Sequence, residues 1–250
     1  VYLRVFNPFS LNIAGRLVWF NRPAVMGVIN VTPDSFYAGS RQSIASDAAM
    51  AAMQMLHNGA DMIDIGACST RPGAEDVSAS EELERLIPAV DAIREAAPEC
   101  LLSVDTFRAE VAHAALEHGA NIINDITGGD ADPAMVPLVA RKHVPYIFMH
   151  MRGTPLTMAT MTDYPDGVVA EVLRSLAEKL RHLSLEGVCD VIADPGFGFA
   201  KTLEQNYELL DNLELIAEAL DVPLLAGISR KSMVTTPLGI AAEDALAGTT

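Results

Sequence analysis

The chain has 250 residues, half of them hydrophobic, and a formal net charge of -16 at pH 7. This length and apolar content provide for a large core and suit either one α/β barrel or two smaller domains. The 17 Lys and Arg residues argue against nucleic-acid binding, which requires clustered cations. We expect one domain over residues 1–250 that grips any anionic substrate through a few local cations or a metal.

Cysteine spacing and hydropathy predict where the protein resides. The three cysteines, Cys68, Cys100 and Cys189, show no CxxC spacing, so neither a disulfide framework nor a thiolate zinc site is indicated. The apolar runs are too short to cross a bilayer, and the first residues do not resemble a signal peptide. We therefore expect a cytoplasmic protein with no membrane partner.

Seven short apolar runs bounded by turn residues are typical of buried parallel strands, which are covered on both faces. In chain order they span Val25 to Ile29, Met62 to Ile65, Leu101 to Val104, Ile122 to Ile123, Tyr146 to Met149, Val191 to Ala193 and Leu224 to Ile228. Helical periodicity marks Ile44 to His57, Ser80 to Ala96, Ala109 to His118, Pro133 to His143, Asp166 to Glu186 and Leu203 to Leu220. The alternation predicts an α/β fold of βαβ units, as a closed barrel or an open sheet.

Each predicted strand ends at or beside a polar or charged residue. These residues are Asn30, Asp64, Asp105, Asn124, His150, Asp194 and Lys231. An α/β barrel builds its active site at the carboxyl ends of its strands, so we expect these side chains to share one cavity. An open dinucleotide-binding sheet is disfavoured, because no GxGxxG motif follows the first strand.

The loops after these strand ends add cations and aromatic rings. Arg71 lies among small residues, where its guanidinium could clamp a phosphate or carboxylate. Phe197 and Phe199 could stack on a flat ring, and Lys231 stands at a predicted helix start, where the macrodipole disfavours a cation. Together these residues predict a site for a polar flat heterocycle and an anion. His150 is expected to be a packed or surface histidine and not a metal ligand, because the residues around it do not have zinc-site spacing.

At these residues the chain closely resembles the dihydropteroate synthase family of pterin-binding barrels. The matching segments, in order and at comparable spacing, are Met26 to Phe36, Ser69 to Ala74, Ser103 to Thr106, Ile123 to Ile126, Met149 to Met151, Asp194 to Phe199 and Ser229 to Ser232. The resemblance covers nearly the whole chain. It implies a TIM (β/α)8 barrel and a transferase that condenses 6-hydroxymethyl-7,8-dihydropterin diphosphate with 4-aminobenzoate, giving 7,8-dihydropteroate and pyrophosphate.

The resemblance also implies a role for individual residues, Mg²⁺ as cofactor and a homodimer. Arg71, Asp105 and Lys231 would act in catalysis, and Asn30 would help bind Mg²⁺ and the diphosphate. The pterin would contact Asp105, Asn124, Met149, Asp194, Phe199, Gly227 and Lys231, while Thr70, Phe199 and Ser232 would border the aminobenzoate and Asp64 would face the site.

The chain also departs from the family pattern. The family continues into an eighth strand ending in Arg-x-His, which binds the diphosphate, whereas the given sequence stops at Thr250. We therefore expect a barrel domain that lacks its eighth strand and helix, with unpaired edges at its first and seventh strands. Cys68 replaces a more usual acidic residue, and Ala200 replaces a usual glycine, which we expect to tune the loops.

Two other functions are left open by these residues. A corrinoid-linked methyltransferase would share the pterin pocket, but it should lack the Arg71 loop and need no diphosphate. A pterin-binding fragment without catalysis would bind pterin and form no product.

Overall fold

The computed structural model describes residues 6–31, 41–68, 77–154 and 157–249. A hairpin of β1 (Phe9–Ile13) and β2 (Arg16–Phe20) precedes a parallel sheet of six strands. The sheet contains β3 (Met26–Asn30), β4 (Met62–Gly66), β5 (Leu101–Asp105), β6 (Ile122–Asp125), β7 (Tyr146–Met149) and β8 (Val191–Asp194). Each strand pairs with its neighbour in chain order, as expected for successive right-handed βαβ units. The α/β fold predicted from the sequence is thus confirmed, although the sheet does not close within the described residues.

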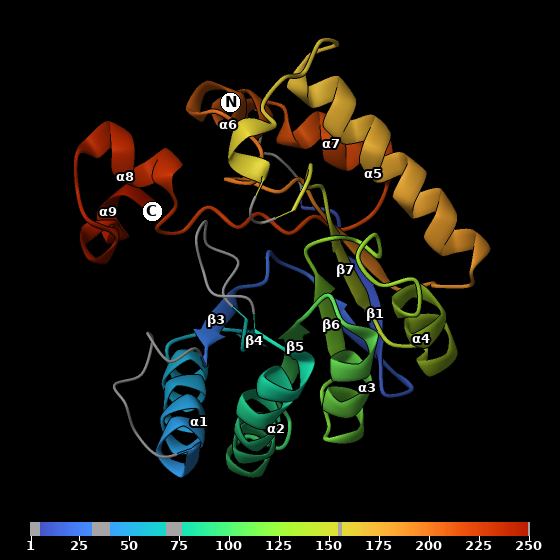
Figure 1. The fold of residues 1–250 in the computed structure, drawn as a ribbon, viewed down its shortest axis with the longest axis vertical. Coiled ribbons are helices and arrows are strands. Elements are labelled where there is room, and N and C mark those ends of the chain that lie inside the picture. The colour runs from blue at the N-terminus through green and yellow to red at the C-terminus, as the bar shows by residue number, and fades with distance from the viewer. Residues whose placement is uncertain (1–5, 32–40, 69–76, 155–156, 250) are drawn as a thin grey trace.

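The helices between the strands cover one face of the sheet (Figure 1). They are α1 (Arg41–His57), α2 (Ala79–Ala96), α3 (Ala109–Glu117), α4 (Met135–Lys142) and α5 (Val168–Leu185). After β8 follow α6 (Leu203–Asp211), α7 (Leu213–Leu220), α8 (Ser232–Leu238) and α9 (Leu246–Thr249). Short 3-10 turns occur at Met158–Thr160 and Ala242–Asp244. Among the described residues, none of these helices has both the length and the apolar character needed to span a bilayer.

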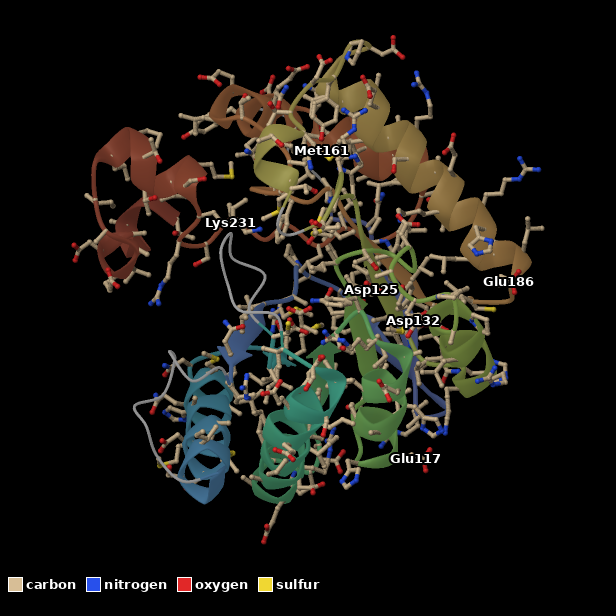
Figure 2. All side chains as sticks on the ribbon, viewed as in Figure 1. Glu117, Asp125, Asp132, Met161, Glu186 and Lys231 are labelled. Carbon is tan, nitrogen blue, oxygen red and sulfur yellow. The ribbon has the colours of Figure 1, made fainter. Side chains whose placement is uncertain are left out.

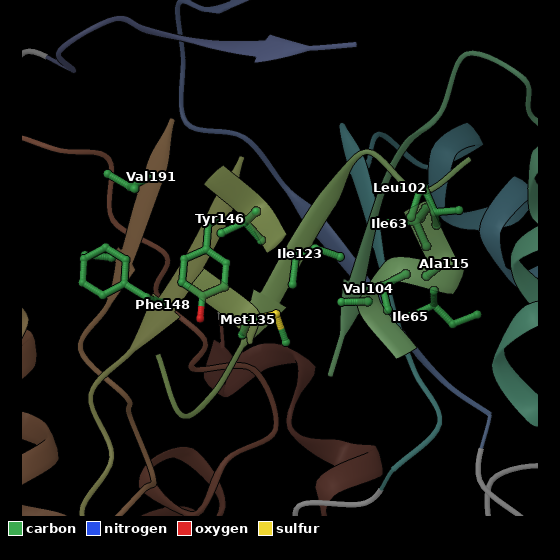
Figure 3. Packing of buried hydrophobic residues seen from close by; sticks show 14 of the residues in the cluster. Ile63, Ile65, Leu102, Val104, Ala115, Ile123, Met135, Tyr146, Phe148 and Val191 are labelled. Carbon is green, nitrogen blue, oxygen red and sulfur yellow. The ribbon is translucent and has the colours of Figure 1, made fainter. Parts of the chain in front are cut away.

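Successive residues of β6 pack into two separate hydrophobic clusters. Ile123 belongs to the larger cluster, which lies between the sheet and its helices and includes Phe148 and Leu86 (Figure 3). Ile122 points to the opposite face, where it packs with Leu11 and Phe20 of the hairpin. Because successive side chains of a strand alternate between faces, β4 to β8 are largely buried on both faces and mostly apolar, whereas β3 at the edge exposes Val28.

The hairpin was not predicted from the sequence, but its position against the sheet explains which of its side chains are buried. Leu11, Ile13 and Phe20 are buried against the sheet, while Leu17 and Trp19 remain exposed. The backbone N–H of Asn12 donates to Asp190 Oδ1 at 2.8 Å, which fixes the hairpin beside the start of β8. The hairpin therefore covers the sheet face opposite the helices, at the end where the strands begin.

The predicted seventh strand, Leu224 to Ile228, is wrong for most of its length. Only a single bridge pairs Leu224 with Ala193. β8 ends at Asp194, Pro195 has no N–H to donate, and Gly196 turns the chain away with φ of 74°. The segment therefore has no partner on this side beyond the bridge. The single helix predicted for Leu203 to Leu220 is likewise two helices, which are separated at Asn212.

Arg94, near the end of α2, joins three elements that bring β5 and β6 into place. Its guanidinium donates to Pro98 O at 2.7 Å, Cys100 O at 2.9 Å, Gly119 O at 2.7 Å and Asn121 Oδ1 at 2.9 Å. Asn121 Oδ1 in turn accepts from the N–H of Leu102 at 3.0 Å. One side chain thus ties the end of α2, the start of β5 and the turn before β6.

Substitution of Arg94 by Met should lower the free energy of unfolding by about 2 kcal/mol or more, because charged hydrogen bonds to partly buried carbonyls are lost. Urea denaturation of the purified variant measures this loss. The control is the same substitution at exposed Arg141 of α4, which should have little effect. Equal stability of the two variants would show that the Arg94 junction does not support the fold.

Candidate functional site

Strand register places the predicted site residues at one edge of the sheet. Asn30 is opposite Gly66, Gly66 is opposite Asp105, and Asp105 is opposite Asn124. On the other side of β7, Met149 is opposite Asp194. In parallel strands these positions all lie at the carboxyl ends. Figure 2 shows Lys231 at this end of the strands with Asp125, while Glu117 lies towards the opposite end.

Asp64 and Asn124 form the buried base of this edge. Asp64 is 4% exposed, and its Oδ2 accepts a hydrogen bond from Asn124 Nδ2 at 3.1 Å. Within the described residues, the other carboxylate oxygen Oδ1 and the buried hydroxyl of Ser103 make no hydrogen bond of normal geometry, although Ser103 lies close enough to Asp64 to lower its pKa. Burial raises the pKa of Asp64, more than Ser103 and Asn124 lower it. The base of the site therefore has buried oxygen atoms that could accept hydrogen bonds from a ligand rich in N–H donors.

Asp105 stands above this base at the end of β5. Burial raises the pKa of Asp105 well above its ordinary value, and the negative charges of Asp64 and Asp125 raise it further. Gly66 makes room for the side chain, since a Cβ at that position would lie 3.3 Å from Asp105 Oδ2. Two carboxyl groups thus share a poorly solvated space, so that each disfavours ionisation of the other.

Asp194, Lys231 and Phe199 form the second half of the site. Asp194 is 7% exposed, and its Oδ1 accepts a hydrogen bond from the N–H of Gly196 at 2.7 Å. Burial raises the pKa of Asp194, whereas the nearby Lys231 cation lowers it. The Lys231 ammonium lies 4.8 Å from the centre of the Phe199 ring and donates to Phe197 O. This half of the site therefore combines a carboxylate, a cation and an aromatic face.

The remaining predicted residues are placed as follows. Met149 is buried beside Asp194, Gly227 lies near the Lys231 ammonium, and Ser232 is the exposed first residue of α8. Asn30 is exposed at the end of β3. Arg71 and Thr70 lie outside the described residues. The structure therefore gathers the pterin-side residues, and the roles of Arg71 and Thr70 remain predictions from the sequence.

His150 and Lys201 form a buried polar pair behind the loop after β8. His150 is 2% exposed, and its Nδ1 lies 3.0 Å from Lys201 Nζ. Burial lowers the pKa of His150 to about 3, so the imidazole is neutral at physiological pH. Its packed position agrees with the prediction. Lys201 was not predicted, although it lies two residues before the start of α6, much as Lys231 directly precedes α8.

Asp105→Asn should raise the melting temperature at neutral pH. The folded-state pKa of Asp105 is raised, so the native state holds its proton more tightly than the unfolded state, and stability falls as pH rises from about 4 to the folded pKa. The amide removes this loss. Thermal unfolding should therefore show a stabilised variant at pH 7 and a smaller difference in acid.

Asp125→Asn is the matched control for this measurement. Asp125 is also buried, but its oxygens accept from Thr127 N at 2.8 Å, Thr127 Oγ1 at 2.7 Å, Gly129 N at 2.9 Å and Tyr146 OH at 2.7 Å. An amide would lose acceptors there and should destabilise the protein. A lower melting temperature for Asp105→Asn at neutral pH would contradict the raised pKa.

Comparison with known proteins identifies the relatives of this chain. The family model of pterin binding enzymes matches residues 26–249. The chain is 44% identical to dihydropteroate synthase of Synechocystis sp. over 218 residues, which cover 86% of this chain and 74% of the relative.

Solved structures give the same result. The chain is similar to Xanthomonas albilineans dihydropteroate synthase with 4-aminobenzoic acid, at a TM-score of 0.87 and 40% identity, covering 96% of this chain and 85% of that one. For the same enzyme in complex with 7,8-dihydropteroate, the TM-score is 0.84 and the identity 38%, with 96% and 85% covered. These similarities bear out the predicted barrel fold class. The chain belongs to the pterin binding enzyme family, in its dihydropteroate synthase group.

Proposed function

We propose that this protein is a dihydropteroate synthase, which joins 6-hydroxymethyl-7,8-dihydropterin diphosphate to 4-aminobenzoate and releases pyrophosphate. The observation that carries the proposal is the joint presence of buried carboxyl groups, an amide and a lysine beside an aromatic ring at one sheet edge. Its relatives, named as synthases, favour this reaction over that of a corrinoid-linked methyltransferase.

The pterin ring fits the chemistry of this edge. A carboxylate can accept two parallel hydrogen bonds from the 2-amino-pyrimidinone side of the ring, and Asp194 is the carboxylate beside a cation. Lys231 would then donate to the ring carbonyl, while Asn124 and Asp64 satisfy the remaining polar groups from the base. Phe199 and Met149 supply apolar walls.

The reaction would proceed without a covalent enzyme intermediate. The C–O bond between the pterin methylene and the diphosphate breaks, the amine of 4-aminobenzoate attacks the resulting cation, and the amine loses one proton. The free protein disfavours ionisation of Asp105, whereas a bound ring rich in N–H donors would favour it, and the resulting charge would stabilise this cation where water is scarce. Arg71 would stabilise the leaving diphosphate from its loop.

The site also suits Mg²⁺ through its oxygen donors. Asn30 presents a carboxamide at the exposed end of β3, and among the described residues no cluster of three His, Cys, Asp or Glu side chains could cage a metal. Mg²⁺ commonly takes few protein ligands and is completed by substrate phosphates and water. When bound, it would neutralise charge that develops on the diphosphate. The homodimer and the cytoplasmic location remain predictions from the sequence.

A product assay tests the proposed function directly. The purified protein is mixed with pterin diphosphate, 4-aminobenzoate and Mg²⁺, and both dihydropteroate and pyrophosphate are measured. The proposal predicts equal amounts of the two products. Pterin binding without either product would instead support the pterin-binding fragment.

Arg71→Ala should lower kcat by about a hundredfold or more, because a group that stabilises the leaving diphosphate is lost. Circular dichroism should remain unchanged, since the guanidinium is not expected to support the fold. Arg141→Ala is the control for loss of a surface cation. Near-normal turnover of Arg71→Ala would remove this residue from the mechanism.

A further inference from the structure

The ammonium of Lys201 is held beneath the loop that connects β8 to α6. Its Nζ donates to Gly196 O at 2.9 Å and to Phe199 O at 3.0 Å, and it lies 3.0 Å from His150 Nδ1. Three acceptors thus match the three N–H groups of an ammonium. Neutral His150 can accept through Nδ1, because burial keeps the pKa of this side chain far below neutrality.

The backbone conformation of this loop is costly and needs hydrogen bonds to hold it. Gly196, Gly198 and Ala200 have φ values of 74°, 81° and 51°, a left-handed conformation that is costly for Ala200. A Cβ on Gly196 would lie 2.1 Å from His150 O, so the chain there passes directly against β7. Asn206 of α6 accepts from the N–H of Gly198 at 2.7 Å. The loop is therefore held by specific polar contacts in place of regular secondary structure.

Two lysines hold this loop from different positions. Lys201 binds the carbonyls of Gly196 and Phe199, while Lys231 binds the carbonyl of Phe197 between them. Under the proposed function, Lys231 also donates to the pterin, so its ammonium divides its donors between the loop and the ligand. The three N–H groups of Lys201 are matched by protein acceptors, so this side chain can hold the loop when the ligand arrives.

We propose that Lys201 is a positioning residue of the pterin pocket. It fixes Gly196 and Phe199, and thereby the Asp194 carboxylate and the Phe199 ring, in the arrangement that binds the pterin, while Lys231 serves the ligand. This inference rests on the proposed function.

The electrostatics of the pair agree with this division of roles. Burial, opposed by Asp194 and assisted by the Lys231 and Arg152 cations, lowers the pKa of Lys201 to about 7. Holding this cation next to another is unfavourable, so its three acceptors must offset the cost. The positive charge also faces Asp194 and favours the ionised carboxylate that a pterin requires.

Lys201→Met tests the assignment, because it keeps the length of the side chain and removes its donors. Affinity for 6-hydroxymethylpterin is measured by isothermal titration on the acid side of neutrality, where the wild-type ammonium is charged. We expect the Kd to rise roughly tenfold or more, since charged hydrogen bonds that hold the loop are lost. Thermal unfolding of the same variant reports its stability.

Lys179→Met is the matched control. Lys179 is also poorly exposed, and it donates to Thr127 O at 2.7 Å and to Asp130 in the loop after β6. We expect this variant to lose stability and to keep its pterin affinity. A folded Lys201→Met with wild-type affinity, or an equal loss of affinity in both variants, would overturn the proposal.

A second variant covers the case in which Lys201→Met does not fold. Lys201→Gln keeps a donor but loses the charge, and it should weaken pterin binding in the same direction. Failure of both variants to fold would show that Lys201 sustains the fold and would overturn its role in the pocket. A wild-type protein that binds no pterin would contradict the proposed function before any variant is compared.

Discussion

The loss of solvent around three carboxyl groups, two buried and one half-buried, at one edge of a parallel sheet is the constraint on which this structure depends. Asp64, Asp105 and Asp194 each have a raised pKa, and the first cause in every case is loss of solvent. Such groups are costly unless they are paired or hydrogen-bonded. Of these three groups, Asp194 has the Lys231 and Lys201 cations of the described chain to offset its charge. The edge therefore holds acceptors that a flat ligand rich in N–H donors can satisfy. In the free protein, the desolvation of these groups lowers stability.

The surrounding framework keeps this costly arrangement in place. Both faces of the sheet are covered, by helices on one side and by the hairpin on the other, so the strands have little freedom to relax (Figures 1 and 3). Gly66 leaves space for Asp105, and Gly196 lets the loop after β8 pass against His150. Precise placement of binding groups generally needs such rigid support.

Much of the site could be predicted because apolar strands that end in polar residues mark the carboxyl edge of a barrel. Six strands and their terminal residues follow this pattern. The prediction of a strand from Leu224 was wrong because its partner β8 ends at Asp194, just before Pro195, which the pattern of one segment alone does not reveal. Lys201 was missed although the reasoning used for Lys231, a cation just before a helix, applies to it equally. The role of Lys201 follows from its contacts with loop carbonyls and with His150, which is far away in sequence.

Proton exchange during pterin binding tests the central claim most directly. Isothermal titration of 6-hydroxymethylpterin in several buffers of different ionisation enthalpy gives the number of protons released. If the ligand's N–H donors favour ionised carboxylates, binding lowers their raised pKa values, and protons are released at acidic pH between about 4 and the raised values. Binding with no proton release across that range, or with proton uptake, would contradict the account.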